Sequence, residues 1–287
     1  MKIGIGLPNP VPGIAGTRLV EWAQHAEERG FASLATIDRL VYPSHDSLMS
    51  LAAAAGATSR IELHTNILLA PVYPAVHLAR AAASLEQLSG GRFSLGVSVG
   101  GREDDYDATG VDYTRRGRIL DEQLALMHRA WRGEPVAGGD QPVGPTPVRD
   151  QRVPVMVGGT SDAAIRRLTT YGAGWTMGGG SPEMAAGMVP KVRAAWQEAG
   201  RPGEPRLAAL TYFSLGEDVK EESWAYLREY YAFLGPYADR IADGALRSED
   251  AIRGAVKAFG DAGITELTFD PTATSLSQID RLADVLL

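Results

Sequence analysis

One stretch of the chain, residues 61–101, constrains the fold more than any other. Residues 61–69 form a short apolar, β-branched run that is typical of a strand buried on both faces. Residues 74–88 begin with a proline, continue with apolar residues at helical spacing and are followed by two glycines, so they predict a helix. Residues 92–99 then predict a second strand. The stretch is therefore a β-α-β unit.

A β-α-β crossover joins two parallel strands, and this fixes where functional residues are expected. Ligand-binding loops in parallel sheets lie at the carboxyl ends of the strands. In this unit those ends are Thr65-Asn66 and residues 98–101. We therefore expect chemistry at these loops rather than along the helix.

The same alternation of strands and helices runs along the whole chain. Strands are expected at residues 2–7, 31–37, 61–69, 92–99, 153–157, 173–177, 207–214 and 264–269. Eight strands alternating with helices predict a (β/α)₈ TIM barrel of α/β class, in one domain of residues 1–287, rather than a doubly wound sheet. Residues 102–107 are expected to form a polar loop.

Two irregular parts interrupt this pattern. Residues 133–153 are rich in glycine and proline and predict an excursion after the fourth helix, and a long segment separates the seventh and eighth strands. We expect both to line or cover the substrate side of the barrel.

Composition excludes several classes of function. The net charge of −7 and the lack of clustered Lys or Arg argue against nucleic-acid binding, and the absence of cysteine excludes thiolate chemistry. The five histidines show no metal-binding spacing, so we expect no metal site. No apolar run approaches the roughly 18 residues of a membrane span, which predicts no membrane association and a cytoplasmic protein.

Two glycine-rich turns carry the clearest functional signal. Gly158-Gly159-Thr160-Ser161 follows the fifth strand and begins a helix. Glycines let the backbone approach a ligand closely, and a helix start offers free N–H groups and a positive dipole end, so this turn predicts a phosphate site. The turn that contains Gly178 and Gly179 repeats the design one unit later. Either turn alone could be a plain tight connection; two in succession favour a ligand.

At these residues the sequence resembles the luciferase-like flavin-dependent oxidoreductases, whose members use FMN or the deazaflavin F420. Five pieces match in order: residues 26–31 with Asp38-Arg39; residues 79–99 with the core Leu-x-x-Leu-Ser-Gly-Gly-Arg-Phe-x-Leu-Gly-Val; Asp105-Tyr106 with Gly110; Arg115 and Arg118 with Asp121 and Glu122; and residues 154–159 with Gly174-Trp175. The likeness covers nearly the whole chain.

The resemblance implies a set of cofactor-binding residues at the strand ends. It places Gly158, Gly159, Thr160 and Ser161 at the phosphate and Asn66 and Ile67 behind the ring system, where relatives tend to have a non-proline cis peptide. Further cofactor contacts are expected at Ser98, Gly100, Gly178 and Gly179. We favour F420, with FMN as the alternative, and a small organic substrate. Family members are often homodimers, so a homodimer is expected.

The expected catalytic residues include one departure from the family. Asp38 occupies a position where relatives often have an acidic or polar residue that touches cofactor or substrate. The next residue is commonly a proton-exchanging His but is here Arg39, which stays protonated and cannot act as a base. Arg39 would instead hold an anionic group, or pair with an acid at the barrel rim. His45 could replace the missing proton transfer or be a solvated loop residue, and Glu103 could approach the ring.

Two alternatives remain from other classes. Gly96-Val97-Ser98-Val99-Gly100 fits the G-x-S-x-G pattern of α/β-hydrolases, with Ser98 as the nucleophile of an esterase. The expected polar loop after Ser98 and the lack of a suitable later His argue against it. The second alternative is a phosphate-binding barrel without redox chemistry, or a flavin-binding protein without turnover. No lysine at a strand end supports an aldolase.

Overall fold

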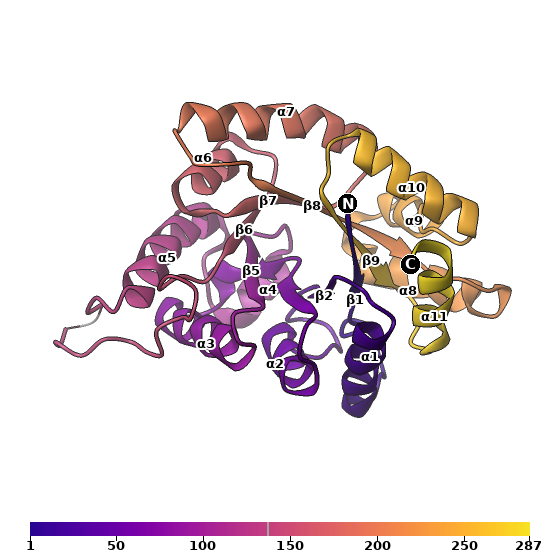
Figure 1. The fold of residues 1–287 in the computed structure, drawn as a ribbon, viewed down its shortest axis with the longest axis horizontal. Coiled ribbons are helices and arrows are strands. Elements are labelled where there is room, and N and C mark those ends of the chain that lie inside the picture. The colour runs from indigo at the N-terminus through magenta and orange to yellow at the C-terminus, as the bar shows by residue number, and fades with distance from the viewer. Residues whose placement is uncertain (137) are drawn as a thin grey trace.

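The computed structural model describes residues 1–136 and 138–287, and its strands form one closed parallel sheet (Figure 1). The strands of the described residues are β1 Lys2–Gly6, β2 Ser33–Thr36, β3 Glu62–Thr65, β4 Leu68–Leu69, β5 Phe93–Ser98, β6 Val155–Gly158, β7 Gly174–Gly179, β8 Arg206–Phe213 and β9 Glu266–Pro271. Their order is β3-β2-β1-β9-β8-β7-β6-β5-β4, and a β3–β5 pairing closes the ring. Since β3 and β4 are two parts of the third predicted strand, the eight-stranded barrel is confirmed.

Helices surround this sheet and bury its outer face (Figure 1). They are α1 Gly16–Glu28, α2 Ser47–Ala57, α3 Ala75–Leu88, α4 Glu103–Thr109, α5 Arg116–Trp131, α6 Asp162–Tyr171, α7 Pro182–Glu198, α8 Lys220–Tyr230, α9 Tyr237–Asp243, α10 Glu249–Asp261 and α11 Ser277–Leu286. Short 3₁₀ turns are η1 Ala70–Val72, η2 Tyr113–Arg115, η3 Glu217–Val219 and η4 Ala232–Leu234. Within the part of the chain that the structure describes, no helix has the length and apolar character needed to cross a membrane.

The expected polar loop at residues 102–107 is instead largely helical, because α4 begins at Glu103. Its first turn carries Glu103, Asp104 and Asp105, whose negative charges favour the amino-terminal end of a helix. Gly110 ends it in the left-handed conformation, with φ of 68°. Sequence periodicity missed this helix because it is only 7 residues long.

The position expected for residues 133–153 is wrong. The backbone N–H of Val148 donates to Glu86 Oε2 at 2.6 Å, and Arg149 N–H donates to Glu86 Oε1 at 3.2 Å. Glu86 lies near the end of α3, just before β5 begins, so this segment packs at the amino-terminal face of the barrel. A connection from a helix to the next strand returns to that face and cannot cover the active one. Ala137 lies outside the described residues.

The long segment between β8 and β9 does lie over the carboxyl-terminal face, as expected. It contains α8, η4, α9 and α10. The Tyr230 carbonyl at the end of α8 accepts a hydrogen bond from Arg39 Nη1 at 3.3 Å, and the Tyr231 hydroxyl lies 2.6 Å from that of Tyr212 on β8. This segment therefore closes over the end of the barrel where the strands finish.

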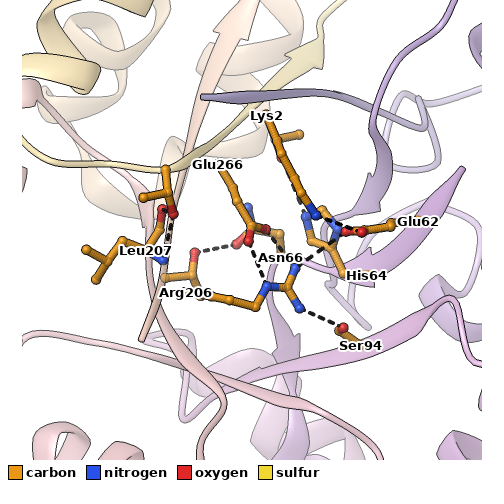
Figure 2. Close-up of polar contacts among 11 residues, drawn as sticks. Lys2, Glu62, His64, Asn66, Ser94, Arg206, Leu207 and Glu266 are labelled. Atoms are coloured by element: carbon orange, nitrogen blue, oxygen red, sulfur yellow. Dashed lines mark hydrogen bonds and ion pairs between the residues drawn. The ribbon is translucent and has the colours of Figure 1, made fainter. Parts of the chain in front are cut away.

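Paired polar side chains lie at the amino-terminal end of the barrel, near the starts of the strands (Figure 2). Arg206 on β8 donates from Nε and Nη2 to the two carboxylate oxygens of Glu266 on β9, each at 2.7 Å, and from Nη1 to Ser94 Oγ at 2.9 Å. Lys2 Nζ lies 2.7 Å from Glu62 Oε1. The Arg206–Glu266 pair satisfies charged groups inside the barrel, whereas the Lys2–Glu62 pair lies at its exposed amino-terminal opening.

Candidate functional site

The mouth of the barrel is lined by the last inward-facing residues of its strands. Side chains alternate along a strand, so the inward positions follow from those that Figure 2 places inside the barrel, among them Lys2, His64, Asn66, Arg206 and Glu266. Every second residue along a strand points inward, so the last inward residues of β1, β5, β8 and β9 are Gly6, Ser98, Tyr212 and Asp270. Gly158 on β6 and Gly178 on β7 complete the ring. Four of these six mouth residues, Gly6, Ser98, Gly158 and Gly178, are glycine or serine, which leaves a shallow floor.

Asn66 and Ile67 form the part of this floor between β3 and β4, and the peptide bond between them is cis. This confirms the cis peptide that the family resemblance implied. Asn66 is buried, its N–H donates to the Thr36 carbonyl at 2.7 Å, and its Oδ1 accepts from Thr176 Oγ1 at 2.7 Å. The Cδ1 atom of Ile67 lies 2.4 Å from the position of a Cβ atom at Gly158 and 3.4 Å from one at Gly178. The Ile67 side chain therefore occupies space that both glycines leave open.

The first glycine turn has a backbone conformation that favours glycine. Gly159 has φ of 115°, which L side chains rarely adopt, and its carbonyl accepts a hydrogen bond from Trp175 Nε1 at 2.8 Å. Ser161 precedes α6 and its Oγ accepts from Ala164 N–H at 3.3 Å, an ordinary helix cap. Thr160 is exposed. The turn thus presents the start of α6 and the Thr160 hydroxyl to solvent.

The second glycine turn begins later than expected. Strand β7 runs on through Gly178 to Gly179 with a register shift after Thr176, whose Oγ1 accepts from Gly178 N–H at 3.1 Å. Gly178 has φ of 67°, and Ser181 caps α7 by accepting from Met184 N–H at 3.4 Å. Because Gly178 and Gly158 both face Ile67, the two turns lie beside each other at one side of the mouth.

Asp38 follows β2 and is held by donors from three elements. The Leu69 N–H donates to Oδ2 at 3.0 Å, the Tyr73 hydroxyl lies 3.1 and 3.2 Å from the two carboxylate oxygens, and the Ser47 hydroxyl donates to Oδ1 at 3.3 Å. Burial raises the pKa of Asp38 to about 6, although the bonds from Leu69, Tyr73 and Ser47 favour the ionised form. Asp38 can therefore gain or lose a proton near neutral pH.

Arg39 does not pair with Asp38 but points toward α4 and α8. Its Nη2 lies 3.4 Å from Asp104 Oδ2, and its guanidinium is 4.5 Å from the ring centre of Tyr42 and 5.6 Å from that of Tyr230. The Arg102 guanidinium stacks on two aromatic rings of the segment between β8 and β9. It lies 4.9 Å from the ring centre of Tyr230 and 3.9 Å from that of Phe233. Two arginines thus fasten the segment that follows α8 to the mouth.

The remaining expected residues lie farther from this cluster or at its edge. The His45 side chain is exposed and its Nε2 lies 2.9 Å from the Ile14 carbonyl, so it joins two loops at the rim. Glu103 is exposed at the start of α4. Ser98 ends β5, and Gly100, with φ of 66°, packs against Leu69: a Cβ atom there would lie 2.6 Å from Leu69 Cδ2. The structure brings Ser98 and Gly100 to the mouth and leaves His45 and Glu103 outside the cluster around Asp38.

The geometry around Ser98 does not support the hydrolase alternative. Four residues separate Ser98 from the start of α4, whereas a nucleophile elbow enters its helix directly. His128 lies on α5, where its ring packs against Trp131 and Tyr171 at centroid distances of 5.1 and 5.2 Å. No described contact connects Ser98 to a histidine.

Sequence reasoning missed several residues of the mouth. The sequence gives no role to Arg102 within its candidate loop and does not single out Tyr73, Tyr212 or Asp270, although Asp270 directly follows the predicted eighth strand just as Asp38 follows the second. The same rule would have found it. Tyr73 and Arg102 carry no local signal, because their partners lie on other elements.

Comparisons with known proteins identify relatives of this chain and structures of the same fold. An uncharacterised protein of Mycobacterium tuberculosis, Rv0953c, is 32% identical over 208 residues, which cover 70% of this chain and 72% of the relative. An F420-dependent secondary alcohol dehydrogenase, solved with an F420-acetone adduct, superposes with a TM-score of 0.81 at 21% identity and covers 99% of this chain and 98% of its own.

A second solved structure is similar in fold but has a different cofactor. The oxygenating constituent of 3,6-diketocamphane monooxygenase from Pseudomonas putida, solved with FMN, has a TM-score of 0.76 at 15% identity and covers 100% of this chain and 99% of its own. The family model described as luciferase-like monooxygenase matches residues 1–268. The chain therefore belongs to the luciferase-like monooxygenase family.

Proposed function

We propose that this protein is an oxidoreductase that binds F420 at the mouth of its barrel and transfers hydride between F420 and a small organic substrate. The observation that carries the proposal is the floor made by Ile67, Gly158 and Gly178, with the Gly158–Ser161 turn beside it. A planar ring needs a flat apolar surface, and a phosphate needs free N–H groups and hydroxyls at a helix start. The mouth offers both within one side of the barrel.

The residues present fit a phosphorylated planar cofactor. Ile67 and Asn66 would lie behind the ring, and Ser98, Gly100, Gly178 and Gly179 would leave room along its edge. Gly158, Gly159, Thr160 and Ser161 would hold the phosphate: the φ of Gly159 suits only glycine, and the Thr160 hydroxyl is exposed. When bound, such a cofactor supplies the two-electron chemistry that side chains lack.

The polar side chains of the mouth would then supply proton transfer and charge stabilisation. Asp38, with a pKa near 6, is the group best suited to take up or release a proton. Arg39 is positioned by Asp104, Tyr42 and Tyr230 and would stabilise negative charge on cofactor or substrate. His45 and Glu103 remain candidates only if the rim closes further on ligand binding.

A second candidate keeps the site and changes the cofactor: FMN, with oxygenation in place of hydride transfer. It is supported by the FMN complex of the diketocamphane enzyme, whereas the F420 complex of the alcohol dehydrogenase supports the first candidate. The phosphate turn suits either cofactor. Structures of this fold hold either cofactor, so the choice of F420 is part of the proposal, and the titration below decides it.

The experiment is an equilibrium titration of apoprotein with F420 and with FMN, followed by tryptophan fluorescence. Trp175 is the intended reporter, since its indole N–H donates to the Gly159 carbonyl in the phosphate turn. A Trp175→Phe variant identifies its share of the signal. Tight binding of F420, with anaerobic reduction of F420 by a panel of secondary alcohols, is the expected result. Binding of FMN alone favours the second candidate, and binding of neither contradicts both.

A further inference from the structure

Asp270 is a fully buried carboxyl group with no partner among the described residues. It is 0% exposed, and neither Oδ1 nor Oδ2 has a hydrogen-bond donor within reach. It lies on β9, in register with Tyr212 on β8, and points into the barrel mouth. A Cβ atom at Gly6 on β1 would lie 1.9 Å from Asp270 Oδ1, so the carboxyl group fills the space that this glycine leaves.

The other inward-facing polar residues of the same strand are paired. Glu266 binds Arg206 through both oxygens at 2.7 Å (Figure 2), and Thr268 Oγ1 lies 3.5 Å from His64 Nε2. Along β9, Asp270 is therefore the inward-facing polar residue whose side chain has no partner, and it lies at the level of the mouth. The Tyr226 hydroxyl on α8, above the mouth, is also buried without a partner.

An unpaired buried carboxyl group reduces stability, so its presence in the barrel needs a reason other than packing. Burial raises the pKa of Asp270 well above its ordinary value, which favours the protonated form of the carboxyl group. A protonated carboxyl group has an O–H to donate and a carbonyl oxygen that can accept. The acceptor for that O–H must come from outside the described protein atoms.

The position of Asp270 indicates which ligand would supply the acceptor. The residues assigned above to the cofactor lie at the ends of β3 through β7, so the ends of β8, β9, β1 and β2 remain for the substrate. Tyr212, the strand neighbour of Asp270, also lines a cavity of about 670 Å³ between β8, α9 and α10 that reaches the end of β7 at Gly179. That cavity is lined mainly by apolar and aromatic residues, among them Leu210, Ile241 and Phe259.

We propose that Asp270 recognises the substrate by donating a hydrogen bond from its carboxyl group to a carbonyl or hydroxyl oxygen, while the apolar body of the substrate extends toward the cavity beside Tyr212. This makes Asp270 a specificity-determining residue for neutral, oxygen-bearing organic molecules. The inference rests on the proposed function, because it assigns the substrate side of the same mouth.

The test uses infrared difference spectroscopy on the protein loaded with the cofactor that it binds. Cyclohexanone is the probe, and methylenecyclohexane, which has the same ring without the oxygen, is the matched control. The carbonyl stretch of protonated Asp270 is identified by its loss in Asp270→Asn. We expect this band to move to lower frequency with cyclohexanone and to stay in place with methylenecyclohexane.

Two variants separate recognition from structure. Asp270→Leu removes the donor at similar volume, and we expect about tenfold weaker cyclohexanone binding with cofactor affinity unchanged. Asp270→Asn keeps an N–H donor and is expected to stay within about threefold of the original affinity. Both variants should be at least as stable as the original protein, because each removes a buried unpaired acid.

Three outcomes would overturn the inference: no protonated carboxyl band at neutral pH, a band that cyclohexanone leaves unmoved, or equal probe affinity in Asp270→Leu. A band that does not move means that the Asp270 carboxyl group binds only an ordered water and not the probe. These results are independent of the cofactor titration, which alone decides the proposed function. If cofactor binds and the band does not move, the oxidoreductase assignment stands and the role of Asp270 does not.

Discussion

The Cδ1 atom of Ile67 lies 2.4 Å from the place where a Cβ atom at Gly158 would be. Carbon atoms do not approach this closely, so position 158 accepts only glycine while Ile67 keeps its conformation. Ile67 follows a cis peptide after β3, and Gly158 ends β6. Two segments far apart in the sequence therefore define one surface at the mouth, and the predictions below test that surface and the groups around it.

The ionisation of Asp38 should make the free energy of unfolding depend on pH. The folded pKa of about 6 lies above the ordinary value of 3.8, so the unfolded chain ionises first as pH rises. The contribution of Asp38 to the free energy of unfolding is therefore highest below about pH 4. It falls by up to roughly 3 kcal/mol between about pH 4 and 6. Denaturant unfolding of the original protein and Asp38→Asn across this range measures the effect.

We expect the stability difference between these two proteins to change in that window, with Asp38→Asn gaining relative to the original protein as pH rises. Glu27 acts in the opposite direction and at lower pH, because its pKa is lowered to about 2 by backbone bonds from Ile61, Arg60 and Ser59 that outweigh burial. A difference between the proteins that is constant from pH 4 to 7 would contradict the raised pKa of Asp38.

Removing the Tyr73 hydroxyl should raise the pKa of Asp38 further. This hydroxyl lies 3.1 and 3.2 Å from the two carboxylate oxygens and stabilises the ionised form. Since a hydrogen bond to a charged group contributes about 1.5–3 kcal/mol, Tyr73→Phe should raise the pKa by about one to two units. Carboxyl-carbon NMR titration measures it. Ser47→Ala, which removes a weaker donor at 3.3 Å, should give a smaller shift, and an equal or larger one would contradict this ranking.

The cover over the mouth should loosen when Arg102 is replaced. Its guanidinium stacks on Phe233 and Tyr230 and donates to the Tyr230 carbonyl, and the side chain is buried. Arg102→Leu should cost about 2 kcal/mol and speed amide hydrogen exchange at residues 230–236. Arg118→Leu, which removes an exposed pair with Glu122, is the control and should cost less than about 0.5 kcal/mol. Unchanged amide hydrogen exchange in Arg102→Leu would show that Arg102 does not hold this segment over the mouth.

The ion pair inside the barrel should be far more sensitive than surface pairs. Arg206→Met would leave Glu266 without its two 2.7 Å bonds, and we expect a loss of about 3 kcal/mol in the free energy of unfolding. Arg206→Met combined with Glu266→Gln should recover part of that loss, because the uncompensated charge is gone. A double variant less stable than Arg206→Met would show that the charge of Glu266 is not the cause.

The sequence predicted the barrel because its strands and helices are marked locally, by β-branched runs, glycine stops and helical spacing. It also predicted the Asn66-Ile67 cis peptide, through the family resemblance rather than through local chemistry. Local patterns could not reveal that Arg39 pairs with Asp104 or that Tyr73 binds Asp38, because these contacts join different elements. The position of residues 133–153 could have been predicted from topology, because a connection from a helix to the next strand lies at the amino-terminal face of the barrel.

The affinity for F420 in Gly158→Ala tests the central claim most directly. The new Cβ would displace the end of the flexible Ile67 side chain, so we expect binding to weaken at least about tenfold with little loss of stability. Gly187→Ala on α7, where a Cβ meets nothing within 4 Å, should leave binding unchanged. Adding Ile67→Val, which lacks Cδ1, should restore binding to Gly158→Ala. Unchanged affinity in Gly158→Ala would mean that the cofactor does not rest on this surface.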